Sequence, residues 1–197
     1  MNTKLFLILL LVMVMASCYT QRLSPAERRR VQSAPADSAM YVLSVFVAED
    51  SLFLRRQSRP LKNPSDRRVQ HLTERMLATV MHPDSRGVGI AAPQVGIGRD
   101  IIWVQRFDKE GEPFEVYFNP QVLSVSEETI DRDEGCLSIP GLRGPVTRPA
   151  SIEVAYTNQH GERLVERVEG FTARIFLHEI DHLRGVLYTD FVEPGSL

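Results

Sequence analysis

The chain has 197 residues, of which 43% are hydrophobic and 24% are charged, and its formal net charge is −2. This composition is typical of a globular protein that is long enough to bury a substantial core. A nearly neutral chain has no electrostatic reason to bind nucleic acid directly. The two cysteines, Cys18 and Cys136, are too few for a disulfide-stabilised scaffold.

The first residues predict a targeting signal. Lys4 precedes an apolar run over residues 5–16, which is shorter than the roughly 20 residues that a transmembrane helix needs. The run leads into Ser17 and Cys18 and resembles a bacterial lipoprotein box, in which the signal is cleaved before a cysteine that then carries lipid. Residues 1–18 are therefore predicted to be a lipoprotein-type signal peptide. An uncleaved apolar anchor, or translation from upstream of the true start, would leave the same pattern.

Residues 19–39 are rich in Ser, Ala, Pro, Gln and Arg and show no apolar period, so they predict a polar tether. The basic run over residues 28–30 is short, and we expect it to be solvated rather than to form a binding patch. The globular domain is predicted to span residues 40–197, and residues 41–48 predict its first strand because they are β-branched and aromatic.

Two helices are predicted within this domain. The first follows Asn63-Pro64-Ser65-Asp66, which is typical of a helix start, and ends before Pro83. Its apolar side chains recur at helical spacing, at Val69, Leu72, Met76, Leu77 and Val80. The second helix is predicted over residues 171–183, with Gly185 as its C-terminal stop.

Strands are predicted at residues 101–104 and 116–118, and a hairpin is predicted from residues 152–156 and 164–168 around the turn at 158–161. Strands that lie before and between two helices, without regular alternation, favour an α+β fold. We expect small antiparallel or mixed sheets packed around a central, buried second helix.

That second helix contains the pattern His178-Glu179-Ile180-Asp181-His182. Histidines four residues apart lie on one face of a helix, so both imidazoles can reach one metal ion. Glu179 lies about 100° around the helix from His178 and is placed to move a proton beside the ion. The flanking residues are mostly apolar, and a buried His-Glu-His set needs partners that a metal supplies. The alternative is a chance pattern on a helix surface.

Cys136 is the candidate third ligand. A third histidine of the metzincin type would stand where this chain has Tyr188. A thermolysin-like enzyme would need a glutamate well downstream, but only fifteen residues follow His182, and their one glutamate, Glu193, lies close behind the helix. A thiolate and two neutral imidazoles would leave one coordination position open, which is typical of a catalytic site. The alternative for Cys136 is a buried, inert cysteine, which is a common fate of a lone thiol.

Three segments together resemble the signature motifs of the peptide deformylase family, in the same order and spacing. They are residues 87–94 (GVGIAAPQ), 134–138 (EGCLS) and 178–182 (HEIDH). Residues 50–55 are similar to an early segment of the same family, and the resemblance covers about residues 40–192. It implies the family's α+β fold around a buried HExxH helix, with residues 40–197 as the catalytic domain.

The resemblance also implies a metal-dependent hydrolase of protein biosynthesis that takes part in N-terminal methionine processing. Such an enzyme removes the formyl group from N-formylmethionyl peptides and releases formate. By position, the metal ligands are Cys136, His178 and His182, and Glu179 is the general acid and base. The amide of Gln94 and the backbone N–H of Leu137 would stabilise the oxyanion, in keeping with two donors aimed at developing negative charge.

Five further residues match substrate-contacting positions of the family. Gly89 would let the substrate backbone approach closely because it has no Cβ, and the peptide would lie extended along a strand edge. Val88, Phe171 and Ile175 would hold the methionine side chain, and Arg143 would contact the peptide. The alternatives are plain core positions for the three apolar residues and an exposed loop charge for Arg143.

The resemblance implies one Fe²⁺ per chain, for which Zn²⁺, Ni²⁺ or Co²⁺ can substitute. We expect a monomer that acts on N-formylmethionyl peptides or nascent chains and carries lipid at Cys18. This places the protein on the extracytoplasmic side of a membrane, or in the cytoplasm if translation starts at Met40, where family members usually begin. Few residues follow Phe191, so we expect no C-terminal helix of the kind that many bacterial members carry.

Two other functions compete with this interpretation. A zinc endoprotease would use the HExxH pattern, but the third histidine or glutamate is missing and residues 134–138 have no place in it. A non-catalytic binding lipoprotein would keep the fold, but the intact Glu179 and Gln94 argue against it.

Overall fold

The structure, a computed structural model, describes residues 22–193. Its regular elements, in chain order, are α2 (Pro25–Val31), α3 (Ala48–Leu54), α4 (Arg67–Val80), η1 (Pro83–Ser85), β1 (Gly89–Ala91), η2 (Ala92–Val95), β2 (Ile101–Gln105), β3 (Phe114–Val125), β4 (Thr129–Cys136), β5 (Ile139–Pro149), β6 (Ser151–Thr157), β7 (Arg163–Glu169), α5 (Gly170–Arg184) and η3 (Tyr188–Phe191). The predicted α+β class is confirmed.

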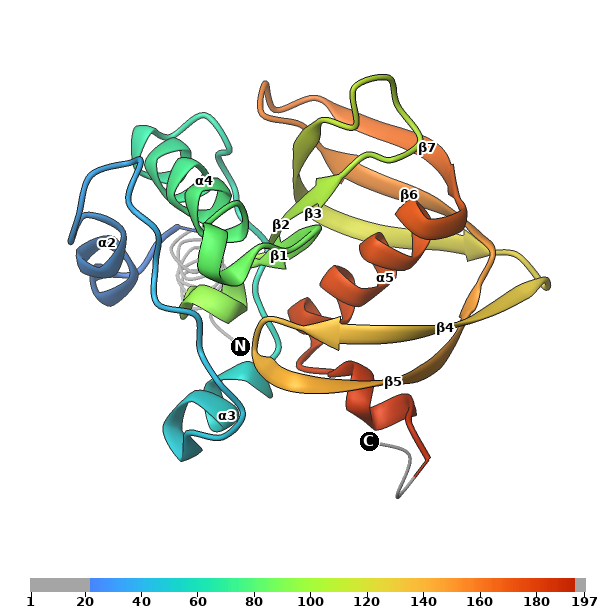
Figure 1. Ribbon diagram of the computed structural model, residues 1–197. Helices are drawn as coiled ribbons and strands as arrows, with labels where there is room; N and C mark the ends of the chain where they lie inside the picture. Colours follow the sequence, from blue (N-terminus) through green and yellow to red (C-terminus); the bar gives the residue numbers. More distant parts are fainter. Residues whose placement is uncertain (1–21, 194–197) are drawn as a thin grey trace, which may run out of the picture.

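The strands form two antiparallel sheets. The larger has the order β1-β2-β3-β6-β7, and β4 and β5 form a separate two-stranded sheet. Helix α5 lies between them, with the larger sheet on one side and β4 and β5 on the other (Figure 1). The helix that carries the HExxH pattern is therefore central, as the sequence predicts.

Strand β2 shows how the sheet separates two hydrophobic clusters. Successive side chains of a strand point to opposite faces. Ile101 and Trp103 pack in the cluster that contains the buried side of α4, whereas Ile102 and Val104 pack in the cluster that contains α5. The central sheet thus supports α5 from one side and is itself covered by α4 on the other.

Both predicted helices are present, and local signals set their ends. The carboxylate of Asp66 accepts a hydrogen bond from the backbone N–H of Arg68 at 2.8 Å and so caps α4. Gly185 ends α5 in the left-handed conformation, with φ of 73°, which glycine adopts without strain. The predicted hairpin of β6 and β7 is also confirmed.

The strand predicted at residues 41–48 is wrong. These residues form an irregular segment that runs into α3, which begins at Ala48. No strand among the described residues pairs with this segment, and its backbone instead bonds to single carbonyls that lie far away in the chain. The N–H of Leu43 donates to the carbonyl of Gln94 at 2.7 Å, and the N–H of Val45 donates to that of Ser138 at 3.0 Å.

The polar tether predicted for residues 19–39 is also wrong for its described part, residues 22–39. Helix α2 packs there against α4, and Leu23 and Val31 are buried in the main hydrophobic cluster. Arg75 of α4, only 4% exposed, donates to the carbonyls of Arg30 and Val31 at 3.0 Å each. The segment is therefore held to the domain both by these two apolar side chains and by the hydrogen bonds from Arg75.

The predicted signal peptide, residues 1–18, lies outside the described residues. Within residues 22–193, no helix is long and apolar enough to cross a membrane.

Candidate metal centre and active site

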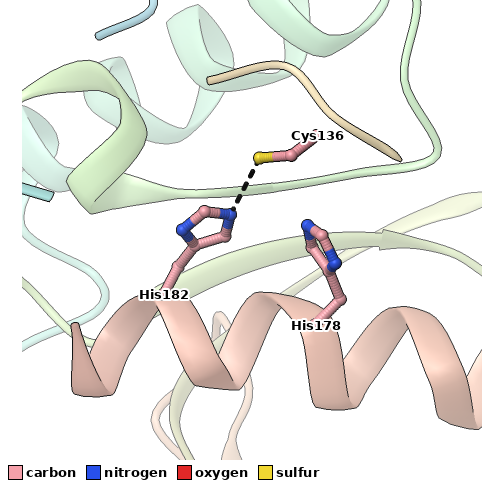
Figure 2. A group of neighbouring side chains, drawn as sticks. All are labelled: Cys136, His178 and His182. Carbon is pink, nitrogen blue, oxygen red and sulfur yellow. Dashed lines mark hydrogen bonds between the residues drawn. The ribbon is translucent and has the colours of Figure 1, made fainter. Parts of the chain in front are cut away.

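Helix α5 presents His178 and His182 side by side, and the end of β4 brings Cys136 over them (Figure 2). One donor atom from each residue lies within 4.8 Å of the other two, and the Cys136 Sγ is 3.2 Å from Nε2 of His182. Donors that each lie about 2.0–2.3 Å from one ion are roughly 3.5 Å apart, so small shifts of these side chains would let all three bind the same ion. The structure therefore brings together the three residues that the sequence predicts as metal ligands.

Glu134 orients one of these ligands. Its buried carboxylate accepts a hydrogen bond from Nδ1 of His178 at 2.9 Å, which leaves the other ring nitrogen for a metal. Arg148 and Arg174 also donate to this carboxylate, at 2.8–3.0 Å. Burial alone would raise the pKa of Glu134, but the bonds from His178 and Arg148 hold it at about 2.

Sequence reasoning gave Glu134 no role, although it begins the segment that contains Cys136. The position of Glu134 could have indicated a role, because it lies two residues before the candidate ligand Cys136, and alternate residues of a strand point to the same face.

Glu179 is the second carboxylate of the site and is only 4% exposed. Among the described residues, nothing forms a hydrogen bond with its Oε2 atom. Burial raises its pKa to about 7, although the nearby charges of His178 and His182 oppose this shift. A buried carboxylate with such a pKa can both accept and return a proton near neutral pH.

The donor set fits a divalent transition metal. Burial raises the pKa of the Cys136 thiol, but the charge of His182 and the hydrogen bond with His178 outweigh burial and lower that pKa well below its ordinary value. The thiolate is the form that binds metal. One thiolate and two imidazoles leave a coordination position open, and the unpartnered Oε2 of Glu179 lies in the same site.

Gln94 and Leu137 lie next to this centre. The side chain of Gln94 is held because its Oε1 accepts from the N–H of Ala91 at 2.9 Å. Its amide nitrogen is then 3.4 Å from the Cys136 Sγ and 3.3 Å from the Ser138 Oγ. Leu137 directly follows Cys136 and lines the same cavity as Gln94.

A cavity of about 500 Å³ opens over the centre, and all five predicted substrate-contacting residues line it. Val88 is 36% exposed and Phe171 38%, so these two side chains have surface to offer a ligand. Ile175 is only 4% exposed; it lines the cavity and also packs in the core cluster of α5. Arg143 is exposed at the rim, where its guanidinium donates to the carbonyl of Asp133 at 3.3 Å.

The structure gives a second reason for glycine at position 89, beside the expected approach of the substrate backbone. A Cβ there would point into the protein and meet Oε1 of Glu179 at 2.5 Å and a methyl group of Ile175 at 2.8 Å. Real Cβ atoms do not approach so closely, so an alanine would displace Glu179. The glycine therefore makes room for the buried carboxylate.

The fold and the site together are those of a metal-dependent hydrolase, with Cys136 and two histidines of α5 as the candidate metal site. A family model described as polypeptide deformylase matches residues 42–196. The chain belongs to the polypeptide deformylase family.

Related sequences and solved structures support the same family assignment. The peptide deformylase of Thermotoga maritima is 40% identical over 160 residues, which cover 80% of this chain and 90% of that protein. The peptide deformylase of Synechocystis sp. is 41% identical over 129 residues, or 65% of this chain and 68% of that protein. A crystal structure of a class I type b peptide deformylase from Acinetobacter baumannii, bound to Met-Ala-Ser, superposes with a TM-score of 0.70 at 33% identity and covers 79% of this chain and 99% of that one.

The protein is thus a metal-dependent enzyme that removes the N-formyl group from peptides in protein biosynthesis. This finding sets aside the zinc endoprotease and the non-catalytic binding lipoprotein.

Proposed function

We propose that Cys136, His178 and His182 hold the catalytic cation in this chain and that Glu179 transfers the protons. The proposal is supported above all by the burial of Glu179 and by its Oε2 atom, which has no hydrogen-bond partner within residues 22–193. When bound, a divalent cation would acidify a water molecule and polarise the formyl oxygen.

Glu179 accepts a proton from the attacking water as the new C–O bond forms at the formyl carbon. It then delivers this proton to the amine nitrogen as the C–N bond breaks, so that formate and a free methionyl amine are the products. Its raised pKa suits both steps, because the group exchanges protons near neutral pH.

The amide of Gln94 and the N–H of Leu137 stabilise the negative charge that develops on the formyl oxygen. The support is that Gln94 is fixed by its bond with Ala91, so its amide donor needs no reorganisation during the reaction. Leu137 lines the same cavity.

The N-formylmethionyl peptide binds in extended form beside β1, the edge strand of the larger sheet. Val88, Phe171 and Ile175 contact the methionine side chain, Gly89 lies on the strand beside the peptide, and Arg143 contacts the peptide backbone.

We further propose that the chain acts as a monomer.

Fe²⁺ is the proposed native metal, one per chain, with Zn²⁺, Ni²⁺ or Co²⁺ as substitutes. A Cys-His-His set suits several of these ions, so the ligands alone do not select iron. Metal analysis of protein purified without oxygen tests the assignment, and zinc as the dominant metal in that preparation would contradict it.

We also propose that Cys18 carries a lipid anchor and that the enzyme lies on the extracytoplasmic side. The support is the order of Lys4, the apolar run and Cys18, together with the packing of residues 22–39 on the domain, which a start at Met40 would remove. Incorporation of labelled palmitate that disappears in Cys18→Ala tests the anchor. A mature N-terminus at Met40 would exclude it.

The central experiment measures formate release from a formyl-Met tripeptide by the full chain, loaded with Fe²⁺ without oxygen. Glu179→Gln should lower kcat by at least about a thousandfold while the bound metal stays constant, because the variant lacks only the proton acceptor. The matched control is Glu169→Gln, an exposed residue at the start of α5, which should stay within about twofold. Substantial activity in Glu179→Gln would exclude the proposed role.

A further inference from the structure

The charges of this chain are divided unevenly along the sequence. Residues 22–68 contain ten basic and five acidic residues, whereas residues 69–197 contain twelve basic and twenty acidic residues. A chain of nearly neutral total charge thus has a basic segment at residues 22–68 and an acidic segment after it. Figure 1 shows that α2, α3 and α4 lie on one side of the molecule and strands β4 to β7 on the other.

Helix α2 presents three consecutive arginines to solvent. Its buried residues are Glu27 and Val31, and each residue turns 100° around a helix. Arg29 therefore points away from the protein, while Arg28 and Arg30 lie on the two flanks, in agreement with the exposure of Arg29 and the partial burial of the other two.

A hollow lies along each flank of α2. One, of about 490 Å³, has Arg22, Arg28, Lys62 and Arg68 in its wall, and the other, of about 450 Å³, has Arg30, Arg56 and Arg59. We call the residues of both hollows, together with Arg29, the basic face. It consists of Arg22, Arg28, Arg29, Arg30, Arg56, Arg59, Lys62 and Arg68.

Few carboxylates neutralise the basic face. Two line its hollows: Glu27 is bound by the buried Arg99 at 2.9 Å, and Asp66 caps α4 and lies 4.0 Å from Arg68. Within the described part of the chain, Arg29, Arg30, Arg56 and Arg59 form no ion pair. In a folded protein such side chains are available to an external polyanion.

The sequence indicates which polyanion this is. An apolar run over residues 5–16 and Cys18 directly precede Arg22, so the basic face follows a segment suited to a lipid environment. Basic clusters next to a membrane segment bind anionic phospholipids, at about a fivefold gain in affinity for each Lys or Arg near the surface. The hollows offer room and positive charge for the phosphate groups of lipids.

We propose that the basic face docks on the surface of an anionic phospholipid bilayer. The acidic residues of β4, β6 and β7, among them Asp131, Asp133, Glu153 and Glu166, are then repelled from the same surface, as is Glu162 in the turn before β7. The attraction at one side and the repulsion at the other orient the catalytic domain on the membrane.

The test compares partition of the full chain, produced without lipid, into phosphatidylcholine vesicles with and without phosphatidylglycerol. The ratio of the two partition coefficients cancels the contribution of the apolar run. We expect the ratio to exceed about ten at low salt and to approach one at 0.5 M salt, because exposed charges are screened. Arg56→Gln combined with Arg59→Gln should lower the ratio by roughly 25-fold, or to one if that is reached first.

The control combines Arg163→Gln with Arg167→Gln, which changes net charge equally on the exposed strand β7. This pair should change the ratio by less than about twofold. A ratio near one for the unmodified chain, an equal loss in both variant pairs, or tighter binding to an RNA duplex than to anionic vesicles would overturn the proposal. Formate release should be unchanged in both pairs, so the outcome is independent of the catalytic assignment.

Discussion

At the scale of single residues, the reactive groups of the site depend on neighbours that hold them in one state. Glu134 fixes the ring of His178, and Gly89 leaves the space that Glu179 occupies. Both neighbours belong to segments that resemble family motifs, yet only the contacts reveal what each one does. Ligand orientation by a buried carboxylate commonly changes metal affinity by 10–100-fold.

We therefore predict that Glu134→Gln weakens metal binding by roughly tenfold or more, because His178 loses a charged acceptor. The measurement is the metal dissociation constant by competition with a chelator. Asp181→Asn is the matched control: Asp181 also accepts from Arg148 but makes no bond to a ligand histidine. Equal affinities for Glu134→Gln and the unmodified chain would contradict the assigned role of Glu134.

At the scale of elements, α2 is a structural part of the domain. Ser24 and Glu27 form a reciprocal cap, in which the N–H of Glu27 donates to the Ser24 Oγ at 3.2 Å and the N–H of Ser24 donates to the Glu27 carboxylate at 2.6 Å. The same carboxylate pairs with Arg99, which is 1% exposed. Burial would raise the pKa of Glu27, but the bond with Arg99 lowers it overall.

Glu27→Gln should lower the free energy of unfolding by about 3 kcal/mol, because it removes the carboxylate opposite a buried arginine. Urea unfolding at pH 7 measures this loss. Asp37→Asn, an exposed carboxylate of the same segment, should change the value by less than about 0.5 kcal/mol. If the two variants are equally stable, the segment is not held by this ion pair.

At the scale of the whole molecule, ion pairs of buried arginines make stability depend on pH. Arg106, whose side chain is 2% exposed, donates twice to Asp108, at 2.6 and 2.8 Å, and also pairs with Glu166 at 2.8 Å. The hydrogen bonds from Arg106 lower the pKa of Asp108 from 3.8 to about 2. The stabilisation is complete above about pH 4, and it is lost as the pH falls through the folded value near 2.

The expected result is that Asp108→Asn is less stable than the unmodified chain at pH 5 and that this gap in unfolding free energy is smaller by about 1 kcal/mol at pH 2.5. Linkage alone would give roughly 1.6 kcal/mol over this pH interval, and the expected value is lower because the Asp108 side chain is 32% exposed and screened by solvent. Urea unfolding at both pH values, with Asp37→Asn as the control, gives the gap. A gap that is constant between pH 5 and pH 2.5 would show that the pair contributes no acid sensitivity.

The sequence by itself determined the helices α4 and α5, the β6–β7 hairpin and the identity of the candidate ligands. These features depend on local signals: the cap at Asp66, the stop at Gly185, and the spacing of His178 and His182 on one helical face. The three motifs added Cys136, which periodicity alone cannot connect to a helix more than forty residues away.

Only the tertiary structure determined that β4 and β5 are strands, that residues 41–48 are irregular and that α2 packs on the domain. Most of β4 is polar and exposed, so its strand state depends on pairing with β5 and not on an apolar pattern. The segment 41–48 has β-forming side chains but no partner strand among the described residues, and α2 is held by a buried ion pair and by the carbonyl contacts of Arg75. The contacts that hold α2 join residues 45 and 72 positions apart in the chain, so no local pattern contains both partners.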